Sequence, residues 1–282
     1  MNWKPIQKTD IQHLNDENKL HHQAIQFIAI AGKYLLPDAD DDSHTSMIWN
    51  TAFNSYVGKE LPQSKRAAVR LPELSLCIFD DKDYVVQSME MSGGTWSELY
   101  DWFEKALQAN NIDTDLLQPE LHYEIPEHGL YETASFDTPN QEMANQVATL
   151  RHNARQILQE ITKPYANANP VSIWPHHFDT GTLIPLQNKQ NETIATIGLG
   201  LAVADEMVDE PYFYVNHWMQ SPPENYPDLK NPGKGEWIIE NWKGSVLPVS
   251  KLFGLSPDQQ EKTAKAFFEA SVSETQKITG KV

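Results

Sequence analysis

The sequence is organised around one stretch in its second half, Ile173-Trp174-Pro175-His176-His177-Phe178-Asp179-Thr180-Gly181. This stretch places two adjacent histidines and an aspartate among aromatic residues. A shift of 125 residues aligns it with an earlier stretch, laying Ile48-Trp49 on Ile173-Trp174, Phe53 on Phe178 and Asn54 on Asp179. The earlier stretch keeps the aromatic residues but has Thr51 and Ala52 where a histidine pair would stand. We therefore expect the aromatic residues to be architectural, and any function to lie with the histidines and Asp179.

The first half of the chain has the pattern of a helix, several strands and a second helix. Apolar residues of helical period predict a helix over residues 18–34, and alternating residues predict strands over 46–58, 67–80 and 84–91. Thr95 and Glu98 form a capping box, which predicts a helix over residues 95–109. A short strand over residues 119–125 and an irregular connection over 126–139 complete this half.

The second half repeats this order of elements. We expect a helix over residues 140–162 that ends before Pro164, followed by strands over 171–186, 193–204, 212–218 and 236–241. Ser256 and Gln259 form a second capping box, with Pro257 at the first helical position of a final helix.

These patterns predict an α+β fold that is internally duplicated. Each half, residues 1–126 and 127–282, would hold a helix, antiparallel strands and a helix, and the halves would pack around a pseudo-twofold axis as one compact unit. Two alternatives stay open, because strand residues also match by chance and because two separate domains can share a class.

Composition excludes some classes of partner. The chain has 282 residues with 39 acidic and 22 basic residues, a formal charge of −17 that disfavours nucleic acid and anionic membranes. The densest basic cluster is Lys59, Lys65, Arg66 and Arg70, which is too small to indicate nucleic-acid binding. The lone Cys77 lies in an apolar strand and is expected to be buried, and no apolar run approaches 18 residues. We expect a cytoplasmic protein.

Three short motifs resemble an uncharacterised bacterial family, a domain of unknown function with two similar α+β halves. They are an early helix ending in Gly32-Lys33, the Phe178-Asp179 strand and the later stretch Pro211-Tyr212-Phe213-Tyr214. In that family the strand matching residues 171–182 also carries histidine and aromatic residues, at a different spacing from the adjacent His176-His177 here. The resemblance implies the layout and no activity.

The histidine stretch is the candidate for chemistry. On a regular strand, side chains two residues apart share a face, so His177 and Asp179 would lie together and His176 would point with Trp174. His177 and Asp179 could act as catalytic residues, since a carboxylate orients an imidazole and raises its basicity. The alternative is a polar cluster on a half-buried strand, bonded to the backbone.

Residues from a later strand complete the hypothesis. His217 is the candidate third ligand for a divalent metal with His177 and Asp179. Ligand-binding walls would come from the aromatic or imidazole rings of Trp174, His176, Tyr214 and Trp218, although such rings are also typical of a core.

Two functions of different classes follow from the sequence. The first is a small-molecule-binding protein or enzyme with a His/Asp pocket and a divalent-metal cofactor. The second is a non-catalytic structural or oligomerisation module with an aromatic core, which would form a homo-oligomer. The sequence leaves open whether the protein is an enzyme.

Overall fold

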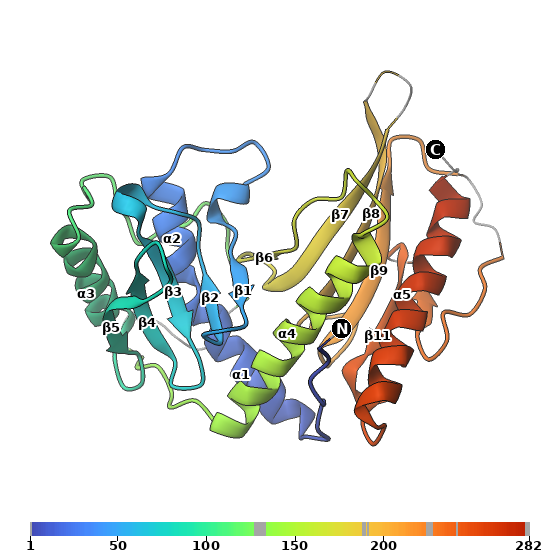
Figure 1. The fold of residues 1–282 in the computed structure, drawn as a ribbon, viewed down its shortest axis with the longest axis horizontal. Coiled ribbons are helices and arrows are strands. Elements are labelled where there is room, and N and C mark those ends of the chain that lie inside the picture. The colour runs from blue at the N-terminus through green and yellow to red at the C-terminus, as the bar shows by residue number, and fades with distance from the viewer. Residues whose placement is uncertain are drawn as a thin grey trace. The chain divides into compact units, whose positions relative to one another are not determined.

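A computed structural model of the chain describes residues 2–126, 134–187, 190, 192–223, 228–240 and 242–279. They form helices and two antiparallel sheets, which confirms the α+β class (Figure 1). The chain divides into two units, which we name by their sheets. The first-sheet unit holds Asp10–Ala148 and Ser172–Phe178, and the second-sheet unit holds Met1–Thr9, Thr149–Val171 and Asp179–Val282.

This division differs from the expected boundary between residues 126 and 127. The chain starts in the second-sheet unit, enters the first-sheet unit at Asp10 and leaves it within a long helix, α4, Gln141–Thr162. Residues 172–178 then return to the first-sheet unit, so the histidine stretch is divided after Phe178. Sequence order alone did not indicate this interleaving, because it depends on contacts between distant segments.

Two helices begin the first-sheet unit: α1, Ile11–Ala24, and α2, Gln26–Leu35. Helix α1 starts earlier than expected because Asp10 caps it, its carboxylate accepting from the His13 backbone N–H at 3.0 Å. The apolar residues of α2 are buried, and α2 packs against strand β3. The helix expected over residues 18–34 is therefore divided at Ile25 into two helices.

The first sheet is an antiparallel meander in the order β1-β2-β3-β4-β5. The expected strands over 46–58 and 67–80 are each divided by a turn, since Asn54 and Leu74 take left-handed backbone angles, with φ of 46° and 52°. The hairpin expected at residues 80–83 is confirmed. The strands are β1 Ile48–Asn50, β2 Ser55–Val57, β3 Arg66–Arg70, β4 Ser75–Phe79 and β5 Val85–Glu90.

Helix α3, Trp96–Ala109, packs against β4 and β5 and has the predicted capping box between Thr95 and Glu98. The Phe27 ring of α2 stacks on the Trp96 ring with centroids 4.3 Å apart. Cys77 is buried in the sheet as expected, and burial raises its pKa to about 11.

The short strand expected at residues 119–125 is not present. In this described stretch the chain is irregular, and the Tyr34 hydroxyl donates to the Glu120 carbonyl oxygen at 2.6 Å. Part of the connection expected at 126–139 lies outside the described residues.

The second-sheet unit has strands in the order β10-β11-β9-β8-β7, again antiparallel. Helix α5 packs on this sheet, with the Phe268 ring against the Phe213 ring, and β11 was not expected from the sequence. The elements are α4 Gln141–Thr162, β6 Ser172–Trp174, β7 Asp179–Gln187, β8 Thr193–Ala202, β9 Tyr212–Met219, β10 Glu236–Ile238, β11 Gly244–Pro248 and α5 Pro257–Thr279. Strand β6 belongs to the first-sheet unit, where Ile173 forms a bridge with Met47. Short 3₁₀ helices occur at Ser43–Thr45, Pro62–Ser64 and Val249–Leu252.

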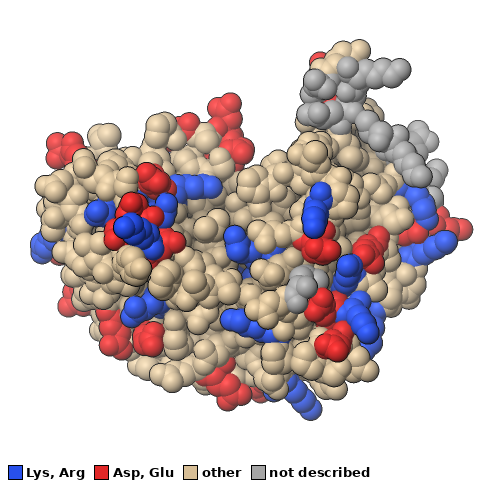
Figure 2. Space-filling model, in the orientation of Figure 1, with Lys and Arg blue, Asp and Glu red and all other residues tan. Residues whose placement is uncertain are grey.

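Within the part of the chain that the structure describes, every helix is too short or too polar to cross a membrane. On the face drawn in Figure 2, the basic side chains of the described residues are interspersed with acidic ones.

Candidate functional site

The two histidines lie in a four-residue turn, Pro175–Phe178, between β6 and β7. The Phe178 backbone N–H donates to the Trp174 carbonyl oxygen at 2.7 Å, and Phe178 has a φ of 53°. The strand expected over residues 171–186 is therefore interrupted at residues 175–178, which include the candidate residues His176 and His177. Because a turn has no two-residue alternation, the expected pairing of His177 with Asp179 on one strand face does not apply.

Side chains of α1 and α2 hold this turn within the first-sheet unit. The Pro175 carbonyl oxygen accepts from His22 Nε2 at 2.8 Å and from Gln26 Nε2 at 3.1 Å. The buried Phe178 ring stacks on the His22 ring, with centroids 5.1 Å apart and planes 6° from parallel, and it also contacts Tyr56. The turn is thus fixed by buried contacts at both ends.

The predicted ligand-binding residues of this turn lie together in an aromatic group. The His176 ring is half-buried and lies 4.4 Å from the His177 ring, 6.2 Å from Trp174 and 5.8 Å from Tyr123, centroid to centroid. His177 itself is exposed. Tyr123 was missed by sequence reasoning; its hydroxyl donates to Gln26 Oε1 at 2.9 Å, and burial raises its pKa. The rings of this group could contact an aromatic or apolar ligand.

Asp179 begins β7 in the second-sheet unit, and its carboxylate accepts from the Tyr214 hydroxyl at 2.5 Å. Glycines make this bond feasible: a Cβ on Gly200 would lie 2.4 Å from the Tyr214 ring, and one on Gly181 would lie 2.9 Å from its hydroxyl oxygen. Burial, and next the charge of Asp179, raise the pKa of Tyr214 well above 10.0. The carboxylate therefore has a neutral phenol as its fixed partner.

His217 and Trp218 follow on β9. Since side chains alternate along a strand, Tyr214 and Trp218 share the Asp179 face and His217 points to the opposite face. Burial, and next the charge of Lys243, lower the pKa of His217. Trp218 is 54% exposed.

The three predicted metal ligands are not brought together by the described structure. Asp179 and His217 point to opposite faces of one sheet, and His177 is exposed in the turn. Among the described residues there is no group of three or more His, Cys, Asp or Glu side chains that could hold a metal ion. Metal binding by these residues stays a prediction from sequence.

A buried relay of polar side chains was also missed by sequence reasoning. Glu17 accepts from His21 Nε2 at 2.9 Å, and His21 Nδ1 lies 3.3 Å from the Tyr56 hydroxyl. The second oxygen of Glu17 accepts from the Asn140 backbone N–H at 2.9 Å, at the start of α4. The side chains of Glu17, His21 and Tyr56 are almost completely buried. Their hydrogen bonds therefore connect α1 with β2 and with the start of α4, and they are not accessible to a ligand. The Glu-His spacing of four residues on a helix was its only local signal.

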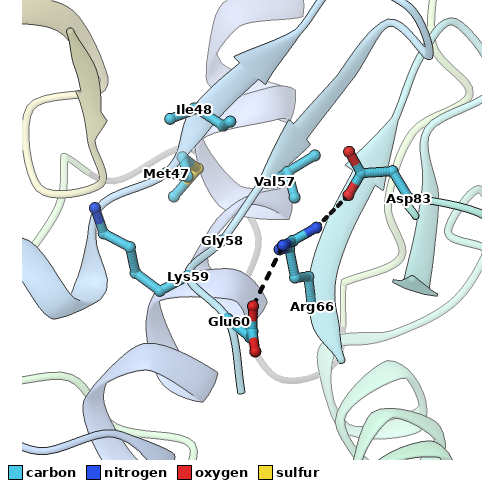
Figure 3. A pocket seen from close by; sticks show the side chains of 8 residues that line it. All are labelled: Met47, Ile48, Val57, Gly58, Lys59, Glu60, Arg66 and Asp83. Atoms are coloured by element: carbon cyan, nitrogen blue, oxygen red, sulfur yellow. Dashed lines mark hydrogen bonds and ion pairs between the residues drawn. The ribbon is translucent and has the colours of Figure 1, made fainter. Parts of the chain in front are cut away.

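A pocket of about 370 Å³ lies in the first-sheet unit, around β1, β2 and the β2–β3 connection (Figure 3). None of the predicted site residues lines it. Arg66 forms ion pairs with two carboxylates. Its Nη1 lies 2.7 Å from Asp83 Oδ1, and its Nη2 lies 3.4 Å from Glu60 Oε2. The lining residues are Met47, Ile48, Val57, Gly58, Lys59, Glu60, Arg66 and Asp83.

Lys59 is the other cation of this pocket. Figure 3 shows its side chain on the side of the pocket away from Arg66 and Asp83. None of the ion pairs formed among the described residues includes Lys59. Met47 and Val57 are buried beside the pocket, at 0% and 2% exposure, so the exposed apolar side chain of the lining is Ile48, at 40%. In the sequence, the only sign of this pocket is the basic cluster of Lys59, Lys65, Arg66 and Arg70, which by itself is too small to indicate nucleic-acid binding.

Comparison with family models, curated proteins and solved structures gives no match.

Proposed function

We propose that the protein binds a small amphipathic anion in the first-sheet pocket. The observation that carries this proposal is the combination of apolar lining with one lysine that has no ion-pair partner among the described residues. Small-molecule sites are typically concave and mostly apolar, with a few polar groups that orient the ligand. The volume of about 370 Å³ lies within the usual range for such sites.

The charge distribution of the pocket supports an anionic end on the ligand. Arg66 already has two carboxylate partners, so a ligand anion would compete with them, whereas Lys59 has no ion-pair partner among the residues that the structure describes. The charge of Lys59 also contributes, as the smallest cause, to the lowered pKa of Asp41, for which hydrogen bonds from Ser43 are the main cause.

The apolar lining supports an apolar body on the same ligand. Met47 and Val57 are buried, and Ile48 is 40% exposed, so a ligand that covers Ile48 would remove apolar surface from water. The described residues that line this pocket include no serine, threonine, cysteine or histidine, and its carboxylates Glu60 and Asp83 are paired with Arg66, so we propose binding without catalysis.

The test is titration calorimetry with three probes of one size: hexanoate, hexylamine and 1-hexanol. We expect hexanoate to bind about tenfold more tightly than hexanol, which corresponds to about 1.4 kcal/mol for one charge-assisted contact, and hexylamine to bind most weakly. The variant Lys59→Gln should remove the preference for hexanoate.

The matched control is Lys65→Gln, in the same connection but outside the pocket, where the lysine Nζ donates to the Gln63 carbonyl oxygen at 3.4 Å. Equal affinity for the three probes, or an unchanged preference in Lys59→Gln, would contradict the proposal.

A second candidate is a homo-oligomer that forms through the edge strand β5. This strand ends the first sheet, and Tyr84, Val85 and Val86 at its start are 62%, 39% and 45% exposed. An exposed apolar edge strand is a template for pairing with another chain. Light scattering should then give a mass above that of one chain, and Val86→Lys should restore the monomer while Leu183→Lys, on the other sheet, should not.

We also infer that the two units arose by duplication, that the chain is distantly related to the bacterial family of unknown function, and that it is cytoplasmic. A short strand, a four-residue turn and a second strand follow one another at 48–57 and again at 172–187, which supports the first inference. The acidic composition and the single buried Cys77 support the last.

A further inference from the structure

Two aromatic rings and a carboxylate meet on the face of the second sheet opposite α5. The Phe213 ring contacts Phe268 of α5, so the next residue of β9, Tyr214, points to the other face. On that face the Tyr214 hydroxyl donates to the Asp179 carboxylate at 2.5 Å. The indole of Trp242, just before β11, lies 6.3 Å from the Tyr214 ring, centroid to centroid, with the ring planes 74° apart. The two rings therefore form a corner, with the carboxylate at the hydroxyl end of the tyrosine.

Glycines let both rings of this corner lie close to the sheet. A Cβ on Gly200 would lie 2.4 Å from the Tyr214 ring, and one on Gly244 would lie 2.5 Å from the Trp242 ring. A larger residue at either position would push its ring away from the strands. Both rings stay half-buried, as does Asp179, so part of each side chain contacts water. The corner is thus fixed by the fold and accessible from solvent.

The charge of Asp179 has no cationic partner in the part of the chain that the structure describes. None of the ion pairs there includes Asp179, and its hydrogen-bond donor, the Tyr214 phenol, is neutral because burial raises its pKa. Lys243 is next to Trp242 in the chain, but its charge acts on His217, which points to the opposite face. The corner therefore offers a negative charge beside two rings, in a chain of formal charge −17 that attracts cations.

A quaternary ammonium ion fits this combination better than other cations do. Ring faces attract a cation through their quadrupole, and a quaternary ammonium ion has apolar methyl groups and no N–H donors. A primary ammonium ion is strongly hydrated and has three donors, whereas the corner offers one carboxylate that already accepts from Tyr214. A metal ion needs several ligands, and the described residues contain no group of three or more His, Cys, Asp or Glu side chains that could hold one.

We propose that Tyr214, Trp242 and Asp179 form a binding site for a small quaternary ammonium compound. The methyl groups of the cation contact the two rings, and the Asp179 carboxylate supplies the opposite charge. This site lies in the second-sheet unit and the pocket around Lys59 lies in the first-sheet unit, so neither proposal depends on the other.

The test is a titration of the full chain with choline, ethanolamine and 3,3-dimethyl-1-butanol, followed by NMR of the backbone amides and indole N–H groups. The branched alcohol has the shape of choline without its charge, and ethanolamine has the charge without the methyl groups. We expect choline to bind at least about fivefold more tightly than either, and to shift the indole signal that is lost in Trp242→Leu. Asp179→Asn keeps an oxygen for the Tyr214 hydroxyl and should weaken choline binding at least about threefold.

Asp205→Asn is the matched control, since it makes the same change in net charge. Asp205 also accepts from a tyrosine hydroxyl, that of Tyr212 at 2.6 Å, but the Tyr212 ring is only 2% exposed, so choline affinity should stay within about twofold. Equal binding of choline and either analogue, or equal effects of the two aspartate variants, would overturn the proposal. If Asp179→Asn does not fold, Trp242→Leu decides. It should weaken choline binding at least about threefold, and an unchanged affinity would count against the site.

Discussion

Two four-residue turns, at residues 51–54 and 175–178, each end in a residue with left-handed backbone angles but have different supports. The turn at residues 51–54 ends with Asn54 at a φ of 46°, and the turn at 175–178 ends with Phe178 at a φ of 53°. The first is held locally, where Asn50 Oδ1 accepts from the Ala52 N–H at 3.0 Å. The second is held by His22, 153 residues away, through the Pro175 carbonyl oxygen.

This difference explains where the side chains of the two turns lie. Asparagine adopts left-handed backbone angles at low cost, and the side chains at 52 and 53 of the first turn are exposed, although the Phe53 ring meets the buried Phe79 ring edge-on. Phenylalanine adopts them only with strain, which the burial of the Phe178 ring offsets. The core contact thereby fixes a turn that presents His176 and His177.

The largest expected effect comes from removing that core contact. Phe178→Ala should lower the free energy of unfolding by about 3–5 kcal/mol, because it leaves a cavity between His22 and Tyr56. Phe53→Ala, at the exposed ring of the first turn, is the control and should cost much less. Urea unfolding measures both, and equal costs would mean that the two turns are supported alike.

The residue that follows each turn gives the next comparison. Ser55 follows the first, and Asp179, bonded to Tyr214, follows the second. Tyr214→Phe should cost about 1–3 kcal/mol, because it leaves the half-buried carboxylate of Asp179 without the hydroxyl donor. Urea unfolding of the variant beside Tyr84→Phe, at a ring that is 62% exposed, tests this; a cost no larger than that of the control would argue against the pair.

Alkaline pH should weaken the same pair. The pKa of Tyr214 is raised above 10.0, first by burial and then by Asp179, so the folded state keeps a proton that the unfolded state loses. The raised pKa of Tyr214 contributes fully to the free energy of unfolding below pH 10. Above pH 10 this contribution declines, by up to about 1.4 kcal/mol per pH unit. Unfolding free energies measured between pH 9 and 11 should fall less steeply in Tyr214→Phe, and identical slopes would exclude this cause.

A smaller effect is expected at the bond from α1 to the second turn. His22→Phe keeps a ring against Phe178 but removes the hydrogen bond to the Pro175 carbonyl oxygen, to which Gln26 still donates. We expect a loss of about 1 kcal/mol in unfolding free energy and faster hydrogen exchange at the Phe178 amide. Unchanged exchange at that amide would show that Gln26 alone holds the turn.

The smallest effect should come from Asn54→Gly in the first turn. Glycine accepts the same backbone angles, so the unfolding free energy should change by less than about 0.5 kcal/mol. Thermal unfolding is sufficient to measure this. A loss above 1 kcal/mol would mean that Asn54 contributes a side-chain contact that the first turn depends on.

The local elements were predictable from the sequence. The capping boxes of α3 and α5 join groups three residues apart, Thr95 with Glu98 and Ser256 with Gln259, and both form as expected. The extent of α4 follows from its apolar period and from Pro164, and it begins and ends within a residue of the expectation. Asp10 had the same kind of capping signal for α1, which was overlooked in favour of the apolar run that starts later.

Only the tertiary structure decided the site. The residue pattern predicts continuous strand through Asn54 and Phe178, where the structure has turns. The histidine stretch is also divided between the two units after Phe178. The pocket brings Met47 near Asp83, and a hydrogen bond joins the Ile6 backbone N–H to Gln260, 254 residues away. Helix caps and periodicity are set by neighbouring residues, whereas a pocket depends on which distant surfaces the fold brings into contact.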